Sequence, residues 1–266
     1  MPLRSVTRHP GSGPQRDITR SRPRCQAGRP AAAWASAYAG GISAIIAAAC
    51  YSSFLLSRWT HAAASVSGGF VSELEDPGQP FSWLYRSSDV LAGLGVLGAA
   101  WALRRVMAGC RRAAAGLVLL ALTGVSSMLD AATSMQCDPG TSATCAQHEH
   151  TAFGLIGQLA AVHTDSGLLG FCSSAAGAAV LGFALVVRWP GWGRLQLAFG
   201  VSIAGCGLAD LILLLAGVSI GLTERARVLF TSGWFLIVGV FLLSEARRAF
   251  RHGSRPPRVA LPMARH

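Results

Sequence analysis

The sequence predicts an all-α integral membrane protein, a polytopic bundle of six transmembrane helices with both termini in the cytoplasm. Three observations predict this class. The chain of 266 residues is 52% hydrophobic and only 13% charged, whereas a soluble domain carries about 25% charged residues. Several runs of roughly 20 apolar residues are long enough to cross a hydrocarbon core of about 30 Å as helices. All 23 basic residues are arginines, and most of them lie outside those runs.

Six apolar runs define the expected spans: residues 33–56, 89–106, 113–134, 165–187, 195–218 and 228–246. A backbone in lipid must satisfy its own hydrogen bonds, so we expect each run to be a helix. The apolar stretch 151–162 is too short to cross alone. Joined to the fourth span it would form a helix of about 54 Å. We interpret it as an interfacial segment or as a helical extension leading into that span.

The distribution of arginine predicts the orientation. With six spans, 19 arginines fall on the side of the two tails, and only Arg58, Arg86, Arg225 and Arg227 fall on the other side. The side rich in arginine normally faces the cytoplasm. Both termini are therefore expected in the cytoplasm, as an even number of spans also requires. The expected location is the cell membrane, which the chain crosses several times.

Two basic tails, residues 1–32 and 249–266, flank the expected transmembrane domain of residues 33–248. The first tail is rich in Arg, Pro, Gly and Ser and has too few apolar residues to fold alone. The formal charge of +11 invites a nucleic-acid interpretation. Basic tails beside membrane spans are explained by topology and by anionic lipid instead. We therefore expect membrane lipid as a partner, and no nucleic acid.

The two longer loops on the expected outer side contain unusual residues. The first loop includes the string FVSELEDPGQPFSWLYRSSDVLAG, with an acidic cluster of Glu73, Glu75 and Asp76. Its Asp-Pro-Gly and Gln-Pro elements are typical of turns. The second loop holds Cys137 and Cys145 in CDPGTSATC. Thiols outside the membrane can oxidise and persist, so we predict a disulfide between them; the alternative is two free thiols.

These strings resemble a known family. The pattern SELxxPGQPxSWLYRxxDxxAG is similar to the first outer loop of a bacterial membrane family catalogued as domain of unknown function 998. SSMLDAATSMQCDPGTSATC resembles its Asp-bearing span and two-cysteine loop, and QLAAVHTDSG resembles its His-containing entry to the fourth span. The family often has a histidine where this chain has Ala160. The resemblance covers residues 35–248 and implies a multi-span membrane protein without an established activity.

Polar residues recur at helical spacing within the spans. Ser127 and Asp130 share one face of the third span, and Cys206 and Asp210 share one face of the fifth. A charged group at membrane depth is costly and is expected to face protein or water. We therefore predict a polar cavity open to the outer side. Its candidate lining residues are Glu73, Asp89, Ser127, Asp130, His163 and Asp210.

Each candidate also has a purely structural interpretation. Asp89 opens the second expected span, where a carboxylate can cap a helix and complement its dipole. Asp130 and Asp210 can act as hydrogen-bonded contacts between helices. His163 alone is more often structural. The sequence leaves these alternatives open.

Three classes of function remain. The first is a membrane protein with an outward-facing polar cavity, acting in transport, sensing or assembly. The second is an intramembrane metal-dependent lipid hydrolase, in which Ser127, Asp130 and His163 would need a further ligand from His61, His148 or His150 to hold zinc. The third is a structural or partner-binding subunit. No Walker A or HExxH pattern occurs, so a non-enzymatic role is favoured. No catalytic residue and no cofactor is assigned.

Overall fold

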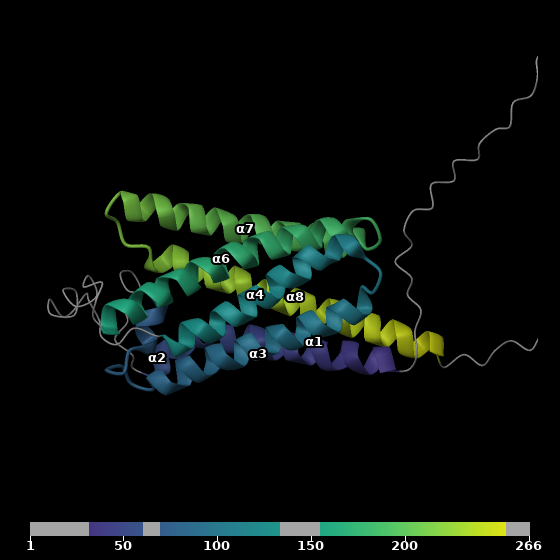
Figure 1. Ribbon diagram of the computed structural model, residues 1–266, viewed down its shortest axis with the longest axis horizontal. Coiled ribbons are helices and arrows are strands. Elements are labelled where there is room, and N and C mark those ends of the chain that lie inside the picture. The colour runs from purple at the N-terminus through teal and green to yellow at the C-terminus, as the bar shows by residue number, and fades with distance from the viewer. Residues whose placement is uncertain (1–31, 61–69, 134–154, 254–266) are drawn as a thin grey trace, which may run out of the picture.

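The computed structural model describes residues 32–60, 70–133 and 155–253, and every regular element within them is helical (Figure 1). The elements are α1 (Ala32–Tyr51), η1 (Ser53–Leu56), α2 (Ser57–Thr60), η2 (Val71–Glu75), α3 (Ser82–Val106), α4 (Arg111–Ala132), α6 (Leu155–Val186), α7 (Pro190–Leu215) and α8 (Gly221–Gly253). Both η1 and η2 are short 3-10 helices. The predicted all-α class is confirmed for these residues.

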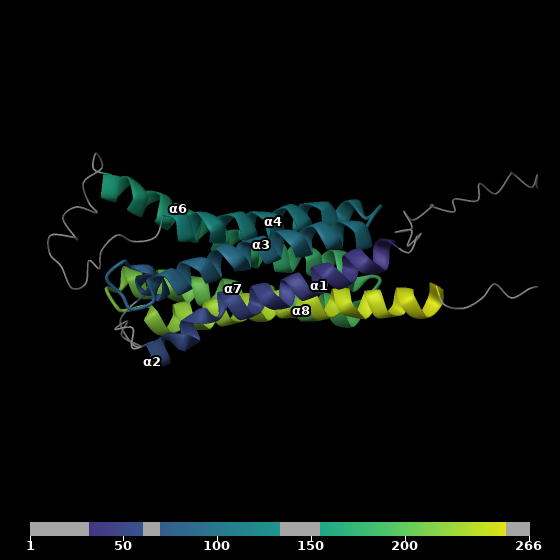
Figure 2. The same cartoon turned by 90° about the horizontal axis from the view of Figure 1, so that it is seen from below.

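The six long helices form a closed ring. Each packs against the next along the chain, in the order α1, α3, α4, α6, α7 and α8, and α8 packs back against α1. They run roughly along the long axis of the bundle (Figures 1 and 2). The short elements η1, α2 and η2 and the turn 216–220 lie at one end, which we call the capped end. The start of α1 and the end of α8 lie at the opposite end.

Five of the described helices are long and apolar enough to cross a membrane: α1, α4, α6, α7 and α8. α3 has 25 residues and is longer than α1 and α4, but it carries Arg86, Asp89, Arg104 and Arg105. The structure therefore supports a bundle of membrane-spanning helices. Six spans and the orientation of the termini stay predictions, and both basic tails lie outside the described residues.

Several helices begin earlier than the hydropathy pattern indicated. α3 begins at Ser82, so Asp89 lies two turns inside the helix and is not its N-cap. α8 begins at Gly221, which places Arg225 and Arg227 in a helix and not in a loop. α6 is a single helix of 32 residues, which agrees with a helical extension before the fourth span. Charged residues lie near the starts of these helices, so a prediction based on apolar residues alone places the start of each helix too late.

Close backbone contact between α3 and α4 positions the polar residues at the capped end. A Cβ atom on Gly93 would lie 2.4 Å from the carbonyl oxygen of Gly124, so only glycine fits at this crossing. One turn away, Ser127 Oγ donates a hydrogen bond of 2.9 Å to the carbonyl oxygen of Asp89. In the ring interior, the indole N–H of Trp234 donates to the side chain of Gln196, which joins α8 to α7. Polar contacts thus link helices across the core.

Candidate functional site

A cavity of about 470 Å³ lies toward the capped end of the bundle, where η1, η2, α3, α4, α6, α7 and α8 all contribute to its wall. Apolar side chains, among them Phe54, Leu168 and Phe171, form one part of the lining. Carboxylate, imidazole and guanidinium groups form the rest. Its size falls within the range of small-molecule sites, which bury most of a ligand between apolar walls and a few polar groups.

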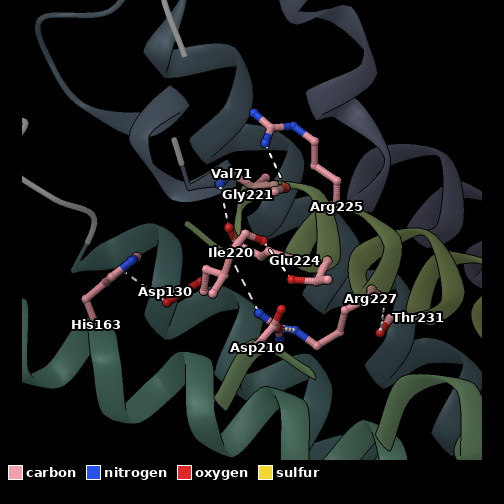
Figure 3. A network of polar contacts seen from close by, with 11 residues as sticks. Val71, Asp130, His163, Asp210, Ile220, Gly221, Glu224, Arg225, Arg227 and Thr231 are labelled. Atoms are coloured by element: carbon pink, nitrogen blue, oxygen red, sulfur yellow. Dashed lines mark hydrogen bonds and ion pairs between the residues drawn. The ribbon is translucent and has the colours of Figure 1, made fainter. Parts of the chain in front are cut away.

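The first polar cluster joins α4 to α6. His163 Nδ1 lies 3.1 Å from Asp130 Oδ1, and Ser166 Oγ donates a hydrogen bond of 2.9 Å to the same oxygen. Ser166 Oγ is also within 2.8 Å of the carbonyl oxygen of His163. Asp130 and His163 point toward one another in Figure 3. The polar faces predicted for the third and fourth spans therefore meet at one carboxylate.

The second polar cluster joins α7 to α8. Arg227 Nε donates a hydrogen bond of 2.9 Å to Asp210 Oδ2, and Arg227 Nη2 lies 3.8 Å from Glu224 Oε1. The other oxygen of Glu224 accepts a hydrogen bond of 2.9 Å from the backbone N–H of Val71. This last bond ties η2, which precedes α3, to the first turn of α8 (Figure 3). The guanidinium of Arg227 therefore forms ion pairs with both Asp210 and Glu224.

The third cluster is a pair of carboxyl groups from η2 and α3. The side chains of Glu75 and Asp89 lie within hydrogen-bonding reach of each other, so a proton held by either carboxyl group would be shared between them. Burial raises the pKa of Glu75 above its ordinary value, and the hydrogen bond with Asp89 partly opposes this effect. Arg86 Nε fixes the loop by donating to the carbonyl oxygen of Glu75 at 2.8 Å. η2 thus places an acidic side chain against the cavity.

The cavity carries more acidic groups than basic ones. Five carboxyl groups line it, from Glu75, Asp89, Asp130, Asp210 and Glu224, against the basic side chains of His163 and Arg227. Even with one carboxyl group protonated, four carboxylates would face at most two cations among the lining residues. An uncompensated buried charge is costly. The wall therefore favours a positively charged species.

Two of these carboxylates have a buried oxygen without a partner. Glu75 is 4% exposed and Asp210 is 6% exposed. Glu75 Oε2 and Asp210 Oδ1 accept no hydrogen bond from the residues that the structure describes. Most buried polar atoms in native proteins are hydrogen-bonded, and exceptions often mark a missing water, ion or ligand. Both side chains line the cavity.

The structure brings four of the six candidate residues to the cavity: Asp89, Asp130, His163 and Asp210. Ser127 lies behind the wall and bonds to the backbone of Asp89. Glu73 is not among the lining residues, because the irregular η2 turns Ser72 and Glu75 to the cavity instead. The role of all six as a functional site stays a prediction.

Other predicted site residues fall outside the described part of the chain. Cys137 and Cys145 do so, and their disulfide stays a prediction. The weak metal candidates His148 and His150, together with His61, are also outside it. Within the described ranges no group of three His, Cys, Asp or Glu side chains is arranged to hold a metal ion. The zinc-hydrolase alternative therefore has His163 and Asp130 but no described third ligand.

Sequence reasoning missed Glu224 and Arg227 as members of the site. Both precede the apolar run that begins at Val228, so the hydropathy pattern assigns them to an outer loop. Their spacing of three places them on one helical face, and that spacing is the signal available in the sequence. Glu75 was noticed in the acidic cluster, but no local pattern distinguishes it from Glu73.

Comparison with known proteins gives a family but no activity. Neither a curated protein nor a solved structure matches the chain significantly. One family model, described as "Protein of unknown function (DUF998)", matches residues 44–241, a stretch that includes α3, α4, α6 and α7 and all the charged residues of the cavity. The chain therefore belongs to the DUF998 family.

Proposed function

We propose that this protein is a multi-pass cell-membrane protein that binds a small cationic solute in its cavity from the outer side, the step with which transport or sensing begins. The single observation that carries the proposal is the pair of buried, unpartnered carboxylate oxygens, Glu75 Oε2 and Asp210 Oδ1, facing the same cavity. A cation with several N–H donors would satisfy both the hydrogen-bonding capacity and the excess charge.

The proposed topology has six spans, with both termini in the cytoplasm and the capped end outside. The arginine distribution of 19 against 4 supports it. The position of α3 in the ring, between α1 and α4, supports counting it as the sixth span. Its 25 residues correspond to about 37 Å of helix, enough to cross the hydrocarbon core. The polar faces of Asp89 and Arg86 then lie near the outer interface.

The internal ion pair suggests how binding proceeds. Arg227 is the counterion of Asp210 and Glu224. An incoming cation approaches Asp210 through its unpartnered oxygen and also contacts Glu75, which lines the same cavity. A positive charge nearby favours the ionised form of a carboxyl group. Burial raises the pKa of Glu75, so a cation bound beside Glu75 promotes loss of a proton from this carboxyl group and couples solute binding to proton release.

Binding of n-butylammonium to the purified protein in nanodiscs tests this proposal, with the neutral isostere n-butanol as the comparison. Isothermal calorimetry in two buffers of different ionisation enthalpy measures affinity and proton release together. We expect saturable binding of the amine, no binding of the alcohol, and at least a tenfold loss of affinity in Asp210→Asn. The control variant is Glu245→Gln, because Glu245 pairs with Arg248 at the other end of α8. Equal binding of amine and alcohol would refute the proposal.

A further inference from the structure

Three apolar side chains of α6 and α7 line the cavity and are also exposed. They are Leu168, Leu211 and Leu214, each of which is more than half exposed. Side chains that both line a cavity and are this exposed point to an opening of the cavity beside them. Leu211 and Leu214 are three residues apart and lie on one face of α7, with Leu168 on the neighbouring helix α6.

This opening lies within the surface that would contact lipid. α7 has few buried residues, and its exposed surface is strongly apolar. The large side chains on that surface are Val201, Leu208, Leu211, Ile212 and Leu215. In a membrane protein such a surface faces the hydrocarbon core. The opening near the end of α7 at the capped end would then communicate with acyl chains and not with water.

Polarity changes steeply along the passage. Leu211 at the opening is adjacent in sequence to Asp210, whose Oδ1 has no partner among the described residues. Phe171 also lines the cavity, and the Arg227 guanidinium lies 5.5 Å from its ring centroid. A ligand that fills both regions must be positively charged at one end and apolar at the other.

We infer that the ligand is a membrane-dissolved cationic amphiphile, a long-chain amine without a phosphate group, which enters sideways between α6 and α7. The inference rests on the proposed function, since it assigns a chain and an entry route to the same cation site. The ammonium group would occupy the space beside Asp210 and Glu75, and the chain would extend past Leu211 and Leu214. A lipid phosphate is disfavoured because the cavity has an excess of carboxylates.

The test measures saturable binding of labelled dodecylamine in phosphatidylcholine nanodiscs, expressed per lipid, with empty nanodiscs as the blank. n-Butylamine and dodecanol are the comparison probes. Leu211→Trp narrows the opening, and Leu214→Trp is a second variant at the same opening if the first fails to fold. Leu208→Trp is the matched control: Leu208 lies on the same helix and is 58% exposed, but it is not among the lining residues.

We expect dodecylamine to bind at least about tenfold more tightly than butylamine, because only the longer chain fills the apolar part of the cavity beside Leu211 and Leu214. Leu211→Trp should reduce that preference at least fivefold, and Leu208→Trp should not. Equal affinity of the two amines, or equal effects of the two tryptophan variants, would overturn sideways entry while leaving the cation site intact. If dodecanol binds as tightly as dodecylamine, the inference that the ligand must be cationic is wrong. Failure of both amines to bind would remove the proposed function itself.

Discussion

Arg227 on α8 and Asp210 on α7 form a hydrogen-bonded ion pair, with Nε and Oδ2 2.9 Å apart. Both side chains are mostly buried, so solvent and salt screen their charges weakly. The same guanidinium is the nearest cation to Glu224, whose second oxygen holds the backbone of Val71. The stability of the capped end and the charge of the cavity therefore depend on one arginine.

Arg227→Met should lower the free energy of unfolding by about 3–5 kcal/mol, because it leaves buried carboxylates without a counterion. Chemical denaturation in mixed micelles measures the change. Adding Asp210→Asn to this variant should restore part of the loss. Arg248→Met is the control, since Arg248 pairs with Glu245 at an exposed position, where such pairs contribute about 0–1 kcal/mol. Equal losses in Arg227→Met and Arg248→Met would contradict the prediction.

Gly93→Ala should destabilise the bundle and weaken cation binding together. The added Cβ would lie 2.4 Å from the Gly124 carbonyl oxygen and would push α3 away from α4, at a cost of about 1–3 kcal/mol. Gly205→Ala is the matched substitution, because nothing lies within 4 Å of a Cβ there. Its expected effect is a gain of up to about 1 kcal/mol from helix propensity. Melting temperatures in detergent distinguish the two, and similar values would refute the packing argument.

The stability of the protein should fall as the pH rises through the acidic range, in part because of Glu75. Burial raises the pKa of Glu75 in the folded state above its ordinary value of 4.5. Between pH 4.5 and the raised pKa of Glu75, the folded state therefore binds more protons than the unfolded state. The contribution of Glu75 to the free energy of unfolding decreases as the pH rises across this interval and is constant above it. Glu75→Gln should flatten this part of the profile. An unchanged slope in melting temperature against pH would show that Glu75 does not contribute.

Asp130→Asn separates a functional carboxylate from a structural contact. The asparagine retains an acceptor oxygen for Ser166 Oγ but removes the charge that faces His163. We expect affinity for n-butylammonium to fall at least tenfold, with a melting temperature close to that of the unchanged protein. The opposite pattern, intact binding and a much lower melting temperature, would identify Asp130 as a contact between helices only.

An alkaline phosphatase fusion tests the orientation. The enzyme is active only outside the cytoplasm, so a fusion after Arg265 should be inactive and a fusion after Gly140 should be active. An additional fusion after Gly109, in the turn between α3 and α4, should be inactive if α3 crosses the membrane. Activity at Gly109 would contradict the proposed topology, because it requires either that α3 does not cross or that the bundle has the opposite orientation.

The part of the site that follows helical periodicity could be predicted, and the part that depends on tertiary folding could not. Asp130 and Asp210 each continue a polar face within an apolar helix, and the energetic cost of exposing them to lipid indicates the interior. In contrast, the hydrogen bond from Val71 to Glu224 joins residues 153 positions apart. Nothing local in the segment before α3 specifies that it folds over the last helix. Whether Glu73 or Glu75 lines the cavity depends on how this segment folds over α8.

Closure of the ring by α1 and α8 has a consequence for biogenesis. Among the six helices of the ring, α1 leaves the ribosome first and its partner α8 leaves last, yet their backbones meet closely where Gly41 packs against Gly239. Contacts between residues so distant in sequence form late, because a long loop must close first. The face of α1 that carries Gly41 must therefore remain without this partner until α8 has been synthesised. Truncation before α8 would leave that face open to lipid, to an insertion factor or to quality-control proteases.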